Sequence, residues 1–231
     1  MENLPESLVV PCFFCYTTLD YNGIVWTAEG SIVTPEKKDK EQDRGLYDWV
    51  QALVCSVLAV VVVFIFAVRI VDVSGESMRE TLQNGDKLLV LNGYLCGDYQ
   101  PGDIVIFQRP DFENGELIVK RVIAGAGQTV DIDFEAGVVY VDGEALEEPY
   151  IREPTWLEEG LEFPVTVPEG CVFLMGDNRN GSKDSRYAGL GPVDTRHIIG
   201  RAMLIAFPGK TVDLDQREWG RIGLLHGTEE S

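Results

Sequence analysis

A serine that follows a glycine by two residues lies in the stretch 73–82, which reads Val-Ser-Gly-Glu-Ser-Met-Arg-Glu-Thr-Leu. A tight turn here would expose the hydroxyl and the backbone N–H of Ser77 together, one as nucleophile and the other as donor to an oxyanion. Gly-x-Ser also occurs in many plain turns, so Ser77 needs a base. The chain has two histidines, His197 and His226, and neither has a convincing partner, which argues against a Ser-His-Asp triad.

A lysine within an apolar run offers another base. Lys120 lies in the strand-like stretch 117–123, where alternation places it on one face with Ile118 and Val122. Burial among aliphatic side chains disfavours the ammonium form and lowers a lysine pKa from about 10.4 toward neutrality. The neutral amine can then accept the proton of a serine hydroxyl. A lysine that reaches solvent from an edge strand fits the same pattern.

The third cluster, residues 176–186, is dense in turn formers, hydroxyls and opposite charges. It fits either a solvated loop or a loop whose hydrogen bonds orient a site. The cysteines add no further site, because their spacing is irregular and no ligands complete the Cys12–Cys15 pair, so no metal is expected. Cys96 and Cys171 would both lie outside the cell, where a disulfide is permitted, and whether they pair stays open.

An uncharged stretch of nineteen residues, 50–68, is long enough to span a bilayer as a helix of about 28 Å. Tyr47 and Trp49 lie at one end, where aromatic side chains favour the membrane interface. The alternative is a buried core helix, but the length and the all-round apolarity argue against it. The stretch begins too late for a cleavable signal peptide. We therefore expect a permanent anchor at 49–70.

The basic residues on either side of this span predict its orientation. Four precede it and two follow it closely, which favours a cytoplasmic N-terminus; they are Lys37, Lys38, Lys40 and Arg44, then Arg69 and Arg79. Residues 1–48 would form a cytoplasmic segment and linker, and the bulk of the protein would lie outside. The net charge of −19 argues against a nucleic-acid partner.

Beyond the span, short apolar runs alternate with turn-forming residues, which is typical of β-structure. The predicted strands are residues 87–92, 103–108, 117–124, 138–141, 171–175 and 200–207. The pair Asp142-Gly143 predicts a hairpin. We expect a mainly β protein, with one N-terminal transmembrane helix and an antiparallel, barrel-like catalytic domain at 71–208. Residues 124–169 would form a small β insertion, and 209–231 a tail.

The three clusters, in this order behind an apolar span, resemble the bacterial type I signal peptidase family, which uses a Ser/Lys dyad. The family's serine box, Ser-Met-x-Pro-Thr-Leu, is similar to residues 77–82, with Glu80 in place of proline. Its Gly-Asp-Ile-Val-Val-Phe box is similar to 102–107, and its lysine box to 119–125. The last box resembles 176–186 closely.

The resemblance implies that Ser77 is the nucleophile and Lys120 the general base of a serine endopeptidase. The backbone N–H of Ser77 would stabilise the oxyanion. Some family members add a serine hydroxyl where this chain has Gly75, so a backbone group or water must substitute. Ser182 would orient the Lys120 amine. Three further residues would hold the loop: Asp177, Asp184 and Arg186.

The family cuts signal peptides from exported preproteins after small-x-small sites, which implies shallow apolar pockets. The residues expected to line them are Met78, Leu82, Ile118 and Val119. The extended substrate would add to an exposed strand edge. The implied partners are preproteins and the lipid bilayer; no metal or organic cofactor is implied, and we expect a monomer in the cell membrane.

Two alternatives belong to other classes. A Ser/Lys self-cleaving peptidase of the repressor type also has a Gly-x-Ser-Met element, but the acidic charge and the apolar span argue against it. An anchored β-domain that binds partners without activity is kept open by two departures from the family boxes. One is Glu80, and the other is Gln128, which ends the stretch 126–128 where the family commonly has Pro-Gly-Asp.

Overall fold

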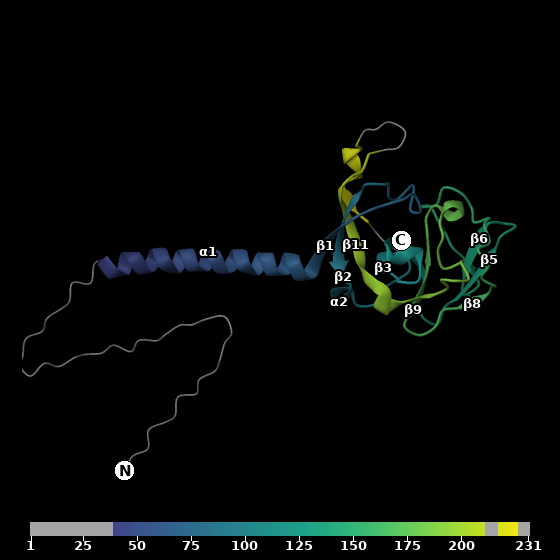
Figure 1. The fold of residues 1–231 in the computed structure, drawn as a ribbon, viewed down its shortest axis with the longest axis horizontal. Helices are drawn as coiled ribbons and strands as arrows, with labels where there is room; N and C mark the ends of the chain where they lie inside the picture. Colours follow the sequence, from purple (N-terminus) through teal and green to yellow (C-terminus); the bar gives the residue numbers. More distant parts are fainter. Residues whose placement is uncertain (1–38, 211–216, 226–231) are drawn as a thin grey trace, which may run out of the picture. The chain divides into compact units, whose positions relative to one another are not determined.

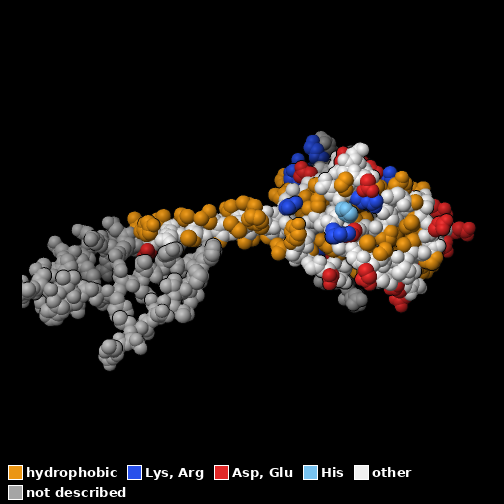
Figure 2. All heavy atoms as spheres, turned by 60° about the horizontal axis from the view of Figure 1, so that its bottom comes forward, with side chains coloured by type: hydrophobic (Ala, Val, Ile, Leu, Met, Phe, Trp, Pro, Cys, Tyr) orange, Lys and Arg blue, Asp and Glu red, His pale blue; other side chains and the backbone are white. Residues whose placement is uncertain are grey.

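The computed structural model describes residues 39–210 and 217–225. The apolar span forms helix α1 (Asp39–Ala67), of which Gly45–Ala67 is, among the described residues, the one helix long and apolar enough to cross a membrane. Its side chains from 45 to 66 are exposed, so the described part of the protein does not bury them in a core. Figure 2 shows hydrophobic side chains along the helix. Such an apolar surface fits a lipid environment.

The helix differs from the expected anchor at both ends. It begins at Asp39, inside the segment that was expected to be a linker. It ends at Ala67, because residues 68–70 belong to the first strand, β1 (Val68–Asp72). This strand pairs with β2 (Lys87–Asn92) along its whole length, so long-range pairing sets the change from helix to strand.

The chain after the helix forms an eight-stranded antiparallel sheet, several strands of which are labelled in Figure 1. Its order is β1-β2-β11-β3-β4-β9-β10, and β12 pairs with β11. The remaining strands of this sheet are β3 (Ile104–Gln108), β4 (Leu117–Ala124), β9 (Cys171–Met175), β10 (Val193–Asp194), β11 (Ile198–Phe207) and β12 (Gly223–Leu224). Every pairing is antiparallel, which confirms the predicted fold class. In the described residues β1 and β10 end the order without pairing to each other, so the sheet is not a closed barrel.

The strands between β4 and β9 form a second sheet of four, in the order β7-β6-β5-β8. They are β5 (Thr129–Asp133), β6 (Val138–Val141), β7 (Glu144–Ala145) and β8 (Val165–Thr166). Asp142 and Gly143 join β6 to β7 in a two-residue hairpin turn. Both have a positive φ, of 53° and 84°, as the type I′ turn requires. The short helices are α2 (Gly93–Cys96), η1 (Glu113–Gly115), η2 (Arg179–Gly181), η3 (Thr195–His197) and η4 (Trp219–Arg221).

Three apolar clusters form the core. One contains residues of β2 and β11 together with Met78 and Leu82, which follow Ser77 in the sequence. A second lies around Phe107 of β3. The third joins the two sheets, because Phe173 of β9 packs with Val130 of β5. The inserted sheet therefore shares a core with the main sheet.

Candidate active site

Ser77 lies in a turn that follows β1. Gly75 has a φ of +96°, a conformation that a residue with a Cβ adopts only at a cost. A helical turn then forms, in which the backbone N–H of Leu82 donates to the carbonyl of Met78 at 2.8 Å. The side chains of Met78 and Leu82 anchor this turn in the core, and Ser77 is left half-buried at its edge.

Lys120 reaches this serine from the middle of β4. Its Nζ lies 2.8 Å from Ser77 Oγ, at hydrogen-bond distance, although the two residues are 43 positions apart in the sequence. The Lys120 side chain is only 2 % exposed. The structure thus brings together the predicted nucleophile and the predicted base.

Burial lowers the pKa of Lys120 to about 8, because the charged ammonium loses its hydration. The nearby carboxylates of Asp184, Glu159 and Asp177 oppose this shift, and the Arg186 guanidinium adds to it. The amine can therefore become neutral near physiological pH, which an exposed lysine cannot do. A neutral amine at this distance can accept the proton of the Ser77 hydroxyl.

The loop 176–186 closes over the serine turn. The backbone N–H of Asn178 donates to the carbonyl of Ser77 at 3.0 Å, and its side-chain amide donates to the carbonyl of Glu76 at 3.1 Å. Gly176 permits this approach, because a Cβ there would lie 2.1 Å from Ser182 Oγ and 2.5 Å from the carbonyl oxygen of Ser77. Gly176 was not among the predicted site residues.

A buried ion pair holds the far side of this loop. Arg186 donates to both carboxylate oxygens of Asp184, at 2.8 and 2.9 Å, and both side chains are inaccessible to solvent. Ser182 Oγ donates to the same carboxylate at 3.0 Å. In the described residues the Ser182 hydroxyl thus bonds Asp184, and not the Lys120 amine as the resemblance implied. Any effect of Ser182 on Lys120 passes through the Asp184 carboxylate.

A second buried pair ties the loop to the lysine strand. Arg121, the neighbour of Lys120, donates to both oxygens of Asp177 at 2.8 and 2.7 Å. Thr81 also donates its hydroxyl to Asp177, so one carboxylate joins β4, the serine turn and the loop. Arg121 was not predicted as a site residue. Its signal in the sequence is a place on the opposite face of the strand from Lys120, together with an acidic residue in the last box.

A third pair joins the loop to the inserted segment. Arg179 forms a bidentate ion pair with Glu148 and donates to Thr155 Oγ1 at 3.1 Å. Arg179 and Thr155 are both buried. These residues were also missed, because the partners lie in separate, irregular segments.

Some predicted residues have a different place from the one expected. The N–H of Gly75 donates to Asn84 Oδ1 at 3.1 Å, so it is already engaged and is no free donor for an oxyanion. Met78 and Leu82 are closed to solvent in the core and line no accessible pocket here. Val119 belongs to the same core cluster, whereas Ile118 is only partly buried.

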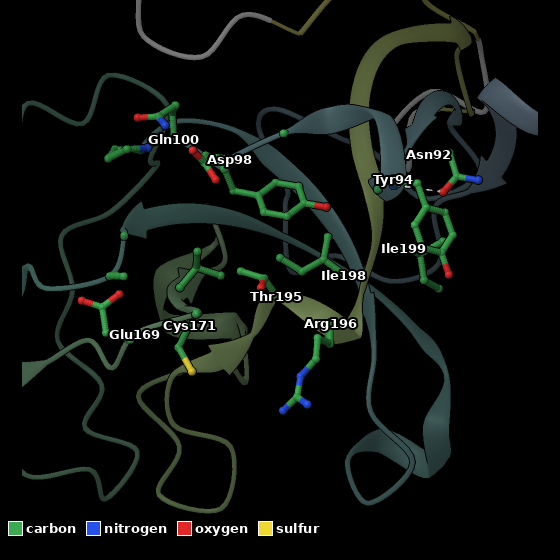
Figure 3. A pocket seen from close by; sticks show the side chains of 18 of the residues that line it. Asn92, Tyr94, Asp98, Gln100, Glu169, Cys171, Thr195, Arg196, Ile198 and Ile199 are labelled. Carbon is green, nitrogen blue, oxygen red and sulfur yellow. Dashed lines mark hydrogen bonds between the residues drawn. The ribbon is translucent and has the colours of Figure 1, made fainter.

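Figure 3 shows a pocket of about 820 Å³, and neither Ser77 nor Lys120 is among the residues that line it. Polar and charged side chains line it, among them Asp98, Glu169 and Arg196. Cys171 also borders this pocket, and both Cys171 and Cys96 are free thiols, so they do not form a disulfide here. Among the residues that the structure describes, no group of three or more potential metal ligands is found. Cys12, Cys15 and His226 lie outside the described residues.

Comparisons with known proteins place the chain in a family. Residues 46–207 match the family described as "Signal peptidase, peptidase S26", and the chain belongs to that family. It is 40% identical over 159 residues to "Probable signal peptidase I-1" of Synechocystis sp., covering 65% of this chain and 74% of that protein. It is 34% identical over 181 residues to "Signal peptidase I" of Bacillus licheniformis, covering 75% and 95%.

Among solved structures, the chain is similar to a signal peptidase I from Enterococcus faecalis. The two are 33% identical, with 45% of this chain and 96% of that chain covered and a TM-score of 0.37.

Proposed function

We propose that this chain is a membrane-anchored serine endopeptidase that removes signal peptides from exported preproteins, with Ser77 as nucleophile and Lys120 as general base. The observation that carries this proposal is the 2.8 Å contact between Ser77 Oγ and a buried lysine whose pKa is lowered to about 8. Membership of the signal peptidase family supplies the substrate class.

The reaction begins when neutral Lys120 takes the proton of Ser77 as Oγ attacks the scissile carbonyl. The resulting ammonium gives this proton to the leaving amine, the C–N bond breaks, and an acyl-enzyme remains on Ser77. Water then attacks the ester with Lys120 again as the base. Lys120 passes the proton that it takes from this water to Ser77 Oγ, the ester bond to Oγ breaks, and the signal peptide leaves with a free carboxylate.

The oxyanion needs a hydrogen-bond donor at the nucleophile turn. The backbone N–H of Ser77 makes no hydrogen bond to any of the described residues, whereas that of Gly75 is engaged by Asn84. This difference supports Ser77 as its own oxyanion donor. Water is the remaining candidate for a second donor, as the resemblance implied.

The substrate would bind in an extended form beside the dyad. The strand that leads into the serine turn, β1, has a neighbour on one side only in the described residues, so its other edge can accept an added strand. Ile118, which is partly buried on β4, remains the candidate for the wall of a shallow pocket. Shallow walls would select the small residues before the cut.

The exposed apolar helix Gly45–Ala67 would anchor the catalytic domain to the membrane. The basic residues before it support a cytoplasmic N-terminus and an extracytoplasmic catalytic domain. An anchor of this kind holds the dyad at the bilayer, where the apolar segment of a preprotein emerges.

The direct test is cleavage of a preprotein with an Ala-x-Ala site by the full chain in detergent, with the new N-terminus of the product determined. We expect a cut after the second alanine, and no product from Ser77→Ala. A wild-type chain that binds the preprotein without cutting it would instead support an anchored binding domain.

A further inference from the structure

The C-terminal segment 217–225 folds back onto the catalytic domain, outside the region that matches the family, which ends at residue 207. Its strand β12 pairs with β11, and the N–H of Leu225 donates to the carbonyl of Met203 at 2.9 Å. Leu225 packs against the core cluster that contains Met78 and Leu82. The segment is therefore in contact with the same cluster that anchors the serine turn.

One side chain of this segment reaches the serine turn itself. Arg221 donates to both oxygens of Asp86, at 2.9 and 2.7 Å, and to the backbone carbonyl of Thr81 at 3.2 Å. Asp86 is inaccessible to solvent and also accepts from the backbone N–H groups of Gln83 and Gly209, each at 2.7 Å. The guanidinium thus joins a buried carboxylate to a carbonyl only four residues after the nucleophile.

The serine turn is held from two sides. The loop 176–186 bonds its beginning, through Asn178 and the carbonyl of Ser77. Arg221 bonds its end, at the Thr81 carbonyl, while the Thr81 side chain is bonded to Asp177. Loss of the guanidinium would remove the ion pair that Asp86 makes with Arg221 and free the end of the turn.

We propose that Arg221 is a positioning residue for the nucleophile: it fixes the end of the serine turn so that Ser77 Oγ stays in reach of Lys120. This inference rests on the proposed function, because it concerns the same dyad. Arg221 acts through the turn and not on the substrate, so its loss should slow acylation without weakening substrate binding.

A matched control lies in the same segment. Arg217 donates to the carbonyl of Pro208 at 3.1 Å and lies over the ring of Phe207 at 4.6 Å. It makes no contact with the serine turn among the described residues. Arg217→Ala therefore removes an arginine and its packing from the segment but leaves the support of the nucleophile in place.

The experiment uses the full chain in detergent and four proteins: wild type, Arg221→Ala, Arg221→Lys and Arg217→Ala. Preprotein cleavage gives kcat and KM, and an acylating lactam inhibitor gives the rate constant for modification of Ser77. Mass spectrometry counts the molecules that react, so this rate constant refers to active molecules only. A variant that is merely less stable loses active molecules but keeps the rate constant.

We expect Arg221→Ala to lower kcat and the acylation rate constant about tenfold at unchanged KM, with Arg221→Lys in between and Arg217→Ala within about twofold of wild type. Guanidinium ion should restore part of the rate to Arg221→Ala. If Arg221→Ala does not fold, Arg221→Lys decides, with about threefold slower acylation expected.

The inference is overturned if the acylation rate constant of the folded Arg221 variants equals that of wild type. It is also overturned if Arg217→Ala slows acylation as much as Arg221→Ala does. In both cases cleavage by wild type leaves the proposed function intact. A wild-type chain that does not cleave removes the proposed function, and this inference with it.

Discussion

At the scale of single residues, the chemistry depends on the charge state of one buried amine. With a pKa of about 8, about one Lys120 side chain in ten is neutral at pH 7, compared with about one in 3,000 at the ordinary lysine value. The group that must be deprotonated therefore titrates within the physiological range.

The rate of cleavage should follow this titration. Because the neutral amine is the base, single-turnover rates should rise about tenfold for each pH unit below 8 and level off above it. The measurement is a rate profile from pH 6 to about 10, with the folded fraction checked at each pH. A profile that is flat over this range would rule out Lys120 as the base.

The neighbouring carboxylate of Glu159 should tune this midpoint. Glu159 accepts a hydrogen bond from the backbone N–H of Asp184 at 3.1 Å, and its negative charge raises the pKa of Lys120. Glu159→Gln removes the charge and keeps an acceptor oxygen, so the midpoint of the pH profile should move to lower pH. Glu158→Gln, at an exposed neighbouring position, is the control and should leave it in place. An unchanged or higher midpoint for Glu159→Gln would contradict this electrostatic account.

Residue types alone could suggest Ser77 and Lys120 but could not pair them. Each fits a common structural role by itself, and the order of the family boxes made the combination specific. The buried partners were harder to predict, because Arg121 and Asp177 are 56 positions apart, and Arg179 and Glu148 are 31 apart. Such pairs form only when the strands and the loop are in place.

At the scale of elements, the site depends on two backbone segments that approach closely. Gly176→Ala would place a Cβ 2.1 Å from Ser182 Oγ, so the loop 176–186 must shift away from the serine turn. We expect activity to fall by about a hundredfold or more in a protein that still folds. Gly125→Ala is the control, because the nearest atom to its Cβ would be 3.8 Å away. Near-normal activity of folded Gly176→Ala would show that this close approach is not required.

The departure from the family's serine box has a local explanation. Glu80 has a φ of +90°, whereas proline is restricted to about −65° and cannot adopt this conformation. Glu80→Gly should relieve the strain and raise the free energy of unfolding by about 1 kcal/mol, less the cost of a more flexible unfolded chain. Thermal unfolding should show a higher Tm for Glu80→Gly and a lower one for Glu80→Pro. The reverse order would contradict the strained turn.

Four strands were predicted with their observed limits: β2, β4, β6 and β9. They carry clear apolar runs bounded by turn formers. The predicted strands 103–108 and 200–207 are also present, as Ile104–Gln108 and Ile198–Phe207. Two unpredicted strands depend on their partners. β1 continues the apolar run of the helix and becomes a strand because β2 pairs with it, and the two-residue β12 exists only as an addition to β11.

At the scale of the whole molecule, the order of segments along the chain could be predicted, but whether the main sheet closes into a barrel could not. The apolar helix, the antiparallel main sheet and a separate sheet within 124–169 all follow from composition and turn signals. The open form of the main sheet could not be predicted, because no local signal states whether β1 and β10 meet. The return of residues 217–225 to the core was also missed, since the predicted tail has no long apolar run.

The most direct test of the account compares wild type with Lys120→Ala in cleavage of a preprotein that has an Ala-x-Ala site. The full chain is used in detergent, and thermal unfolding shows whether the variant is folded. We predict that wild type cuts after the second alanine and that folded Lys120→Ala forms no product at any pH, because Ser77 has lost its base. Cleavage by both proteins would contradict the Ser77–Lys120 mechanism.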